Sequence, residues 1–181
     1  MLVKIKMICI IEVTILLIII LSIKMSNGKK LCDSVNIQEI SEWANNLPAL
    51  KAQGYEPDVN VTGDEVENGA RPQPFMVYEN LERLGVFPIQ SVVKVDDTVG
   101  GIGEGLNAGC WTVGLSRYSN YMNINSHEEE SRLSDSEIAH RNNKSRKILE
   151  RAGAHYVVDS IRELPEVCYE INQKLKNGIH P

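Results

Sequence analysis

Two adjacent carboxylates, Asp96 and Asp97, are the residues whose type and position most directly suggest chemistry. They follow the stretch Val92–Val95, which is apolar except for Lys94 and is typical of a buried parallel strand. In doubly wound α/β sheets, ligands bind at the carboxyl ends of the strands, and carboxylate oxygens are ligands that suit Mg²⁺. The pair therefore predicts a magnesium site at that edge. The alternative is that one of the two only caps the following helix.

Arg71 is a candidate for binding an anion. Arg71-Pro72 stands at the expected start of a helix whose stop signal is Gly85. A helix N-terminus presents unpaired N–H groups and a partial positive charge, so Arg71 and this helix could together hold a phosphoryl group. An ordinary exposed arginine is the alternative.

Other motifs do not support a second chemistry. The stretch Gly103–Ala108 matches G-x-G-x-x-A, but it begins well after Val95 rather than directly after the strand, as dinucleotide binding requires. No acid ends the next apolar stretch to hold a ribose. The four histidines lack ligand spacing, and no Ser-His-acid or Cys-His arrangement stands out.

The elements that must position these residues alternate between strand and helix. We expect strands over Val59–Thr62, Val92–Val95, Cys110–Leu115 and His155–Val158. We expect helices over Ile40–Ala52, from Arg71 to Gly85, over Thr98–Ala108, and after the capping-box sequences that begin at Ser134 and Ser160; Ser116–Ser134 should be a loop. This order predicts an α/β fold with a parallel sheet covered on both faces.

The segment Met7–Ile23 is almost entirely apolar and is flanked by lysines. As a helix it would be about 26 Å long, close to the lower limit for crossing a bilayer of ~30 Å. We therefore divide the chain into residues 1–25, an apolar N-terminal segment that could anchor it in a membrane, and residues 26–181, a core domain. A signal peptide, a core strand and a sequence foreign to the ancestral domain are the alternatives.

Charge and cysteine content exclude some function classes. The chain has 181 residues and a formal net charge of −5, and its N-terminal segment is the more basic part, so the core is more acidic still. Such a domain is poorly suited to a phosphate backbone, which argues against nucleic-acid binding. The four cysteines form no Cys-x-x-Cys pair, which argues against structural zinc.

From about Leu47 to the C-terminus, the sequence resembles phosphonoacetaldehyde hydrolase, a family of the haloacid dehalogenase superfamily. The resemblance rests on long stretches in the same order, which are Ala52–Asp58, Gly69–Met76, Leu84–Pro88, Val93–Val99, Glu104–Gly114 and Ala152–Ser160. It implies a haloacid dehalogenase-like, Rossmann-like parallel sheet with flanking helices.

The resemblance also implies a mechanism. In the family, an aspartate at the end of the first core strand attacks phosphorus, Mg²⁺ bridges it and a second acid, and a lysine of a helical cap domain forms an imine with the aldehyde. Carried over by motif, Asp97 is the metal-binding acid and Arg71 the phosphonate-binding residue. Ser34 is a further substrate-binding candidate, from a faint match over Gly28–Ser34.

This sequence departs from the family pattern at several places. Gly101 stands where the family has a further acid, and Asp96 stands where it has a glycine. No nucleophile motif and no cap lysine are recognised, since the apolar segment stands in their place. The resemblance thus predicts an incomplete sheet that follows an apolar N-terminal helix, lacks its first, central strand and cap domain, and has an unpaired inner edge.

Two hypotheses on function follow. The first is an Mg²⁺-dependent hydrolase that cleaves the C–P bond of phosphonoacetaldehyde, giving acetaldehyde and phosphate. The second is a catalytically inactive, truncated or membrane-tethered relative of that enzyme. The family implies a cytoplasmic domain that binds a small phosphonate, with a homodimer and membrane contact through residues 7–23 as further expectations.

Overall fold

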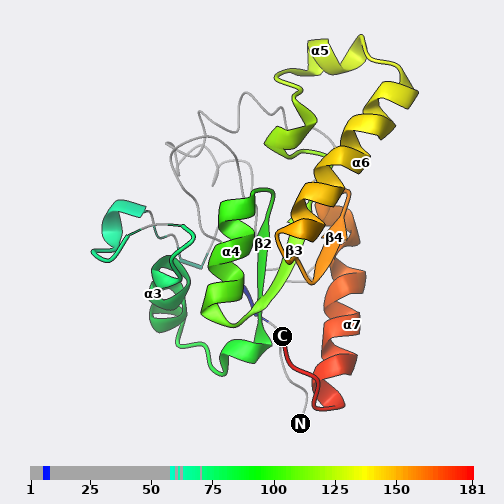
Figure 1. The fold of residues 1–181 in the computed structure, drawn as a ribbon. Coiled ribbons are helices and arrows are strands. Elements are labelled where there is room, and N and C mark those ends of the chain that lie inside the picture. The colour runs from blue at the N-terminus through cyan, green and yellow to red at the C-terminus, as the bar shows by residue number, and fades with distance from the viewer. Residues whose placement is uncertain (1–5, 9–57, 60, 62, 70) are drawn as a thin grey trace.

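The computed structural model describes residues 6–8, 58–59, 61, 63–69 and 71–181. Four parallel strands form one sheet in the order β1-β2-β3-β4, over Lys6–Ile8, Val92–Asp96, Trp111–Leu115 and Tyr156–Val158. The helices are α3 (Phe75–Leu84), α4 (Val99–Ala108), α5 (His127–Ser131), α6 (Asp135–Arg151) and α7 (Leu164–Lys176). The expected α/β fold with flanking helices is confirmed (Figure 1).

Helices cover both faces of the sheet. Glycines allow two of them to approach one face closely, since a Cβ on Gly105 of α4 would lie 2.6 Å from Thr112 of β3, and Gly114 of β3 lies under Leu149 of α6. On the other face, β2 and β3 form a buried cluster with the side chains of α7, among them Val93, Val95, Trp111, Val113, Val167 and Ile171. The sheet is thus the middle layer of three, as a parallel sheet requires.

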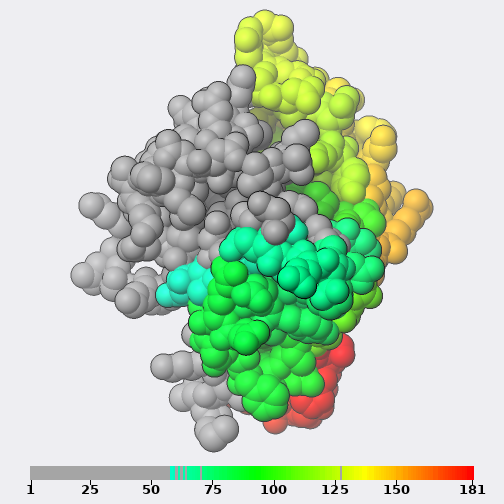
Figure 2. Space-filling view, turned by 90° about the vertical axis from the view of Figure 1, so that its left-hand side faces the viewer, coloured from blue at the N-terminus to red at the C-terminus, as the bar shows by residue number. Residues whose placement is uncertain are grey.

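Helix α3 extends the first face beyond α4. Its side chains Met76 and Val77 form a second buried cluster with Val61, Val92 and Cys110. Figure 2 shows this part of the surface, where the green region of α3 and α4 adjoins the cyan segment before it. The left-handed Gly85 (φ 59°) ends α3, as the sequence predicts.

Strand β1 corrects the prediction of an unpaired inner edge. Lys6–Ile8 pairs in parallel with Val92–Lys94, so β2 has neighbours on both sides. Met7 and Ile8, the first two residues of the expected apolar helix, are therefore in a strand, because a short apolar run suits either structure and an open edge offers unpaired N–H and C=O groups. The remainder of Met7–Ile23 and the expected helix Ile40–Ala52 lie outside the described residues.

Three further expectations need correction. Val59 and Val61 are not in a strand, although Val61 is buried in the second cluster. Helix α3 begins at Phe75 rather than beside Arg71, because prolines at 72 and 74 lack N–H groups and disfavour helical residues before them. The expected loop Ser116–Ser134 contains a 3₁₀ turn over Asn120–Met122 and the short helix α5.

Within the ranges that the structure describes, no helix combines the length and the apolar character that a bilayer crossing needs.

Candidate functional site at the carboxyl end of β2

The turn between β2 and α4 is organised by Thr98, which caps the helix. Its hydroxyl accepts a hydrogen bond from the N–H of Gly101 at 3.1 Å. Asp96 in turn holds Thr98, since its Oδ1 accepts from the Thr98 N–H at 2.9 Å and from the hydroxyl at 2.8 Å. The alternative that one of the aspartates caps the helix is therefore not what the structure shows. Thr98 is the cap, and Asp96 holds Thr98 in place through two hydrogen bonds.

A buried cluster of charged side chains lies under this turn. The Nζ of Lys94 is 3.1 Å from Oδ2 of Asp96 and 3.0 Å from Oε2 of Glu104, and all three side chains are fully buried. Arg71 lies at longer range, with its Nη1 3.7 Å from Asp96 and its Nε 3.4 Å from Glu104, and its side chain is 11% exposed. The two carboxylates therefore hold both cations in place.

Asp97 lies beside this cluster in a different environment. The residue is 2% exposed, and neither carboxylate oxygen accepts a hydrogen bond from another of the described residues. Burial, followed by the neighbouring charge of Asp96, raises the pKa of Asp97 to about 8, against the weaker lowering effects of its own backbone N–H, Arg71 and Lys94. A buried carboxylate without a donor is costly unless it is protonated or meets a cation.

The loop after β3 closes over the same turn. The hydroxyl of Ser119 donates to the carbonyl oxygen of Asp97 at 2.7 Å, and the hydroxyl of Tyr121 accepts from the N–H of Val99 at 3.1 Å. The loop therefore holds the main chain at Asp97 and at Val99, while the Asp97 side chain accepts no hydrogen bond from another described residue.

The structure brings together two of the three site residues predicted from the sequence. Arg71 lies close enough to Asp97 for its charge to lower the pKa of that carboxyl group. However, Arg71 faces buried carboxylates and does not stand at the start of α3. Ser34 lies outside the described residues. Sequence reasoning missed Lys94 and Glu104, although a lysine inside an apolar strand was a signal that a buried partner must exist.

The described residues contain no group of three His, Cys, Asp or Glu side chains arranged to hold a metal ion. Asp96 and Glu104 form ion pairs with Lys94, whereas Asp97 forms none with a described residue. Asp97 can therefore contribute a ligand to a cation, and any complete coordination shell needs further oxygens.

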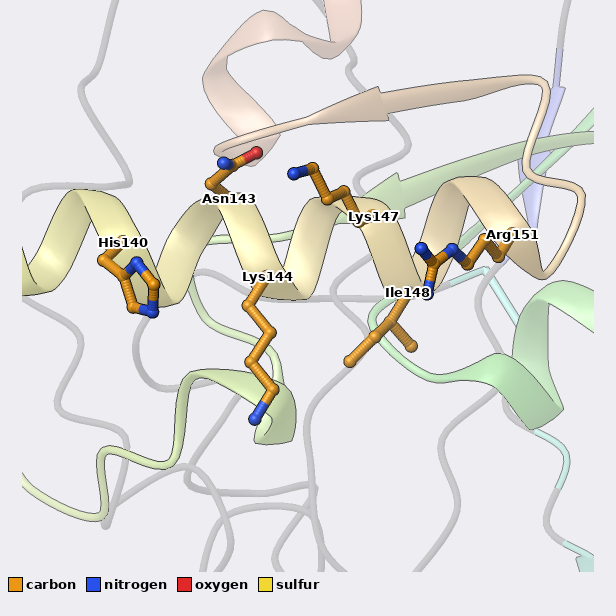
Figure 3. A pocket seen from close by; sticks show the side chains of 6 residues that line it. All are labelled: His140, Asn143, Lys144, Lys147, Ile148 and Arg151. Atoms are coloured by element: carbon orange, nitrogen blue, oxygen red, sulfur yellow. The ribbon is translucent and has the colours of Figure 1, made fainter.

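A separate hollow on the surface lies along α6. It is lined by His140, Asn143, Lys144, Lys147, Ile148 and Arg151, and Figure 3 shows Lys144 and Ile148 on the side of the helix opposite Asn143 and Lys147. The hollow shares no residue with the cluster under α4 and has no carboxylate in its lining. We therefore place the candidate site at the carboxyl end of β2.

The sheet order, the crossing helices and the acid at the end of β2 define an α/β domain of the haloacid dehalogenase-like type. The chain is similar to a crystal structure of a phosphonoacetaldehyde hydrolase-like protein from Oleispira antarctica, with a TM-score of 0.72 and 38% identity, over 78% of this chain and 50% of that one. No protein-family model matches the chain.

Curated relatives give the more particular relationship. Phosphonoacetaldehyde hydrolase of Klebsiella pneumoniae subsp. pneumoniae is 44% identical over 135 residues, and that of Paraburkholderia xenovorans is 43% identical over 136 residues. Each match covers 75% of this chain and 50% of the relative, so the chain spans about half the length of the curated relatives it matches. The chain is therefore a relative of the phosphonoacetaldehyde hydrolases, and the resemblance is confirmed.

Proposed function

We propose that this chain carries the magnesium- and phosphonate-binding part of a phosphonatase-type site, which cleaves phosphonoacetaldehyde to acetaldehyde and phosphate. The observation that carries the proposal is the Asp97 carboxylate, which is buried at the carboxyl end of a central strand and accepts no hydrogen bond from another residue that the structure describes. The named activity of the curated relatives gives the substrate class.

The residues present fit a hard divalent cation. Two cations, Arg71 and Lys94, face three carboxylates, so the ionised cluster carries one excess negative charge, and Asp97 is the acid that forms no ion pair with a described residue. Mg²⁺ is usually bound through one or two carboxylates and keeps several waters, so Asp97 would be one of its ligands. When bound, Mg²⁺ neutralises charge on phosphoryl oxygens.

Arg71 is the residue we propose for the phosphonate oxygens. Asp96 and Glu104 fix its guanidinium group within electrostatic reach of Asp97, so the cation and the anion sites would adjoin. A planar guanidinium can bind two oxygens of one phosphonate, which a lysine cannot do with the same geometry. Ser34 remains a proposed substrate-binding residue on the resemblance alone.

The test is the Mg²⁺-dependent release of phosphate from phosphonoacetaldehyde by the purified chain. We expect Asp97→Asn to abolish Mg²⁺ binding, measured by calorimetry, and any phosphate release. Asp135→Asn, which changes an exposed acid of α6, is the matched control and should leave both intact. Undiminished Mg²⁺ binding by the Asp97→Asn protein would contradict the proposed ligand.

A second candidate function is a catalytically inactive relative. One observation favours it, which is that both cations of the cluster are engaged by Asp96 and Glu104. The expectation from the resemblance that a nucleophile motif and a cap lysine are missing points the same way. Loss of the nucleophile removes many orders of magnitude of rate. Mg²⁺ binding that depends on Asp97, without phosphate release above buffer, would support this candidate and exclude the enzyme.

Two expectations on partners stay proposals from the sequence. Membrane contact through residues 7–23 would appear as co-sedimentation of the chain with lipid vesicles, and a homodimer as twice the monomer mass in solution. A chain that stays in the supernatant as a monomer would remove both.

A further inference from the structure

Asp96 and Gly101 meet across the first turn of α4, where the space between them accepts one side chain only. A Cβ built on Gly101 would lie 1.6 Å from Oδ2 and 1.8 Å from Cγ of Asp96, far below the 3.0 Å that real Cβ contacts respect. The carboxylate of Asp96 therefore fills the volume that any larger residue at 101 would need.

That carboxylate connects three parts of the site. Its Oδ1 accepts two hydrogen bonds from Thr98, which caps α4. Its Oδ2 lies 3.1 Å from Lys94 Nζ and 3.7 Å from Arg71 Nη1. One side chain thus joins the helix start to both cations of the cluster, and the glycine opposite gives it the room to do so.

We propose that Asp96 and Gly101 are a coupled pair, in which residue 96 carries the carboxylate that positions Arg71. A Cβ–Cγ bond is only about 1.5 Å long, so an aspartate at 101 facing a glycine at 96 would return a carboxylate to nearly the same place. Asp96 is accordingly a positioning residue that acts through Arg71.

The proposal concerns the same site as the proposed function, and its test needs neither Mg²⁺ nor a substrate, so the two can fail separately. The variants Asp96→Gly, Gly101→Asp and the double exchange are made in the full chain. Urea unfolding reports stability, and phenylglyoxal labelling followed by peptide mass spectrometry reports how firmly Arg71 is held. The internal reference is Arg132, which directly follows α5 and whose side chain is 73% exposed.

We expect Gly101→Asp to lower the urea midpoint because two carboxylates compete for one volume. Asp96→Gly should label at Arg71 several-fold faster than the wild type, with Arg132 unchanged. The double exchange should return both the midpoint and the Arg71 rate close to wild type. Additive effects in this cycle, or a double exchange that labels as fast as Asp96→Gly, would overturn the coupling.

Asp96→Asn keeps the test decisive if the glycine variant does not fold. The amide retains the volume and removes the charge, so Arg71 should label faster while Gly101→Asp remains unfavourable in this background. A stability loss in Asp96→Asn with an unchanged Arg71 rate would show that Asp96 only supports the helix cap, and would refute the positioning role.

Discussion

Replacing Lys94 by methionine tests the buried charge cluster most directly. The substitution keeps most of the side-chain volume and removes the Nζ that lies 3.1 Å from Asp96 and 3.0 Å from Glu104. All three side chains are fully buried, so the two carboxylates would keep only the longer contacts with Arg71, at 3.7 and 3.4 Å, within the described part of the chain. Removing one partner of a buried ion pair costs about 3–5 kcal/mol, which corresponds to a fall in Tm of roughly 6–20 °C for a chain of this size.

The loss should depend on pH. Burial already raises the pKa of Glu104 despite the opposing effect of Lys94, and removing the lysine raises it further. An acid whose pKa is raised by folding stabilises the protein at low pH, and that stability is lost as the pH rises above the unfolded value. The Lys94→Met protein should therefore approach wild-type stability at acid pH, and its loss of stability relative to wild type should be largest above neutral pH.

Urea unfolding followed by circular dichroism at several pH values gives the measurement. Lys144→Met changes an exposed lysine of α6 in the same way and should stay within about 0.5 kcal/mol of wild type. The pair Lys94→Met with Glu104→Gln should recover part of the loss, since one unpaired charge is removed. A Lys94→Met protein as stable as the Lys144→Met control would refute the account of this cluster.

The remaining predictions concern the carboxyl group of Asp97, two glycines and two thiols. Asp97 has its pKa raised from 3.8 to about 8, so between those values the folded protein keeps a proton that the unfolded chain releases. Its stability should fall as the pH rises through that window, by up to about 1.4 kcal/mol per pH unit, and Asp97→Asn should remove that slope in urea unfolding without Mg²⁺; parallel curves would contradict it. Gly105→Ala should lower the free energy of unfolding by about 1–3 kcal/mol, because its Cβ would lie 2.6 Å from a β3 side chain. Gly109→Ala (φ 80°) meets no atom and should cost only the backbone strain of about 1–2 kcal/mol. Thermal unfolding compares the two variants, and a larger loss in Gly109→Ala would contradict the steric argument. Burial raises the pKa of the Cys110 thiol to about 12, so this thiol should react with maleimide far more slowly than that of the partly exposed Cys168. Peptide mass spectrometry measures the two rates, and equal rates would show that the chain around the start of β3 unfolds locally.

The strand–turn–helix unit around the site could be predicted from local sequence signals. An apolar run and a glycine-ended helix follow one another, and they become β2 and α4 almost at the expected residues, although the cap of α4 is Thr98 and neither of the two aspartates considered for it. These signals act over a few residues, so neighbouring side chains in the sequence contain most of the information. The position of Asp97 at the sheet edge follows from them alone.

The partners within the cluster could not be predicted in this way. Lys94 was visible as a polar residue in an apolar strand, but Glu104 comes from the next helix and Arg71 from the segment before α3. Whether these side chains meet on one face of the sheet depends on the close packing of α4 against that sheet, which Gly105 permits. Strand β1 was missed for the related reason that an apolar run does not tell which edge it will join.

The contrast between Asp96 and Asp97 explains why only one of them is available for a cation. The two are adjacent and both deeply buried, yet Asp96 accepts two hydrogen bonds from Thr98 and faces Lys94, while no other described residue donates to the Asp97 oxygens. A metal ion competing for Asp96 would have to displace a fully buried lysine and uncap α4, whereas a metal ion at Asp97 would displace only a proton. The charge that stabilises this fold and the charge available for chemistry are therefore carried by different residues, although they are neighbours in the sequence.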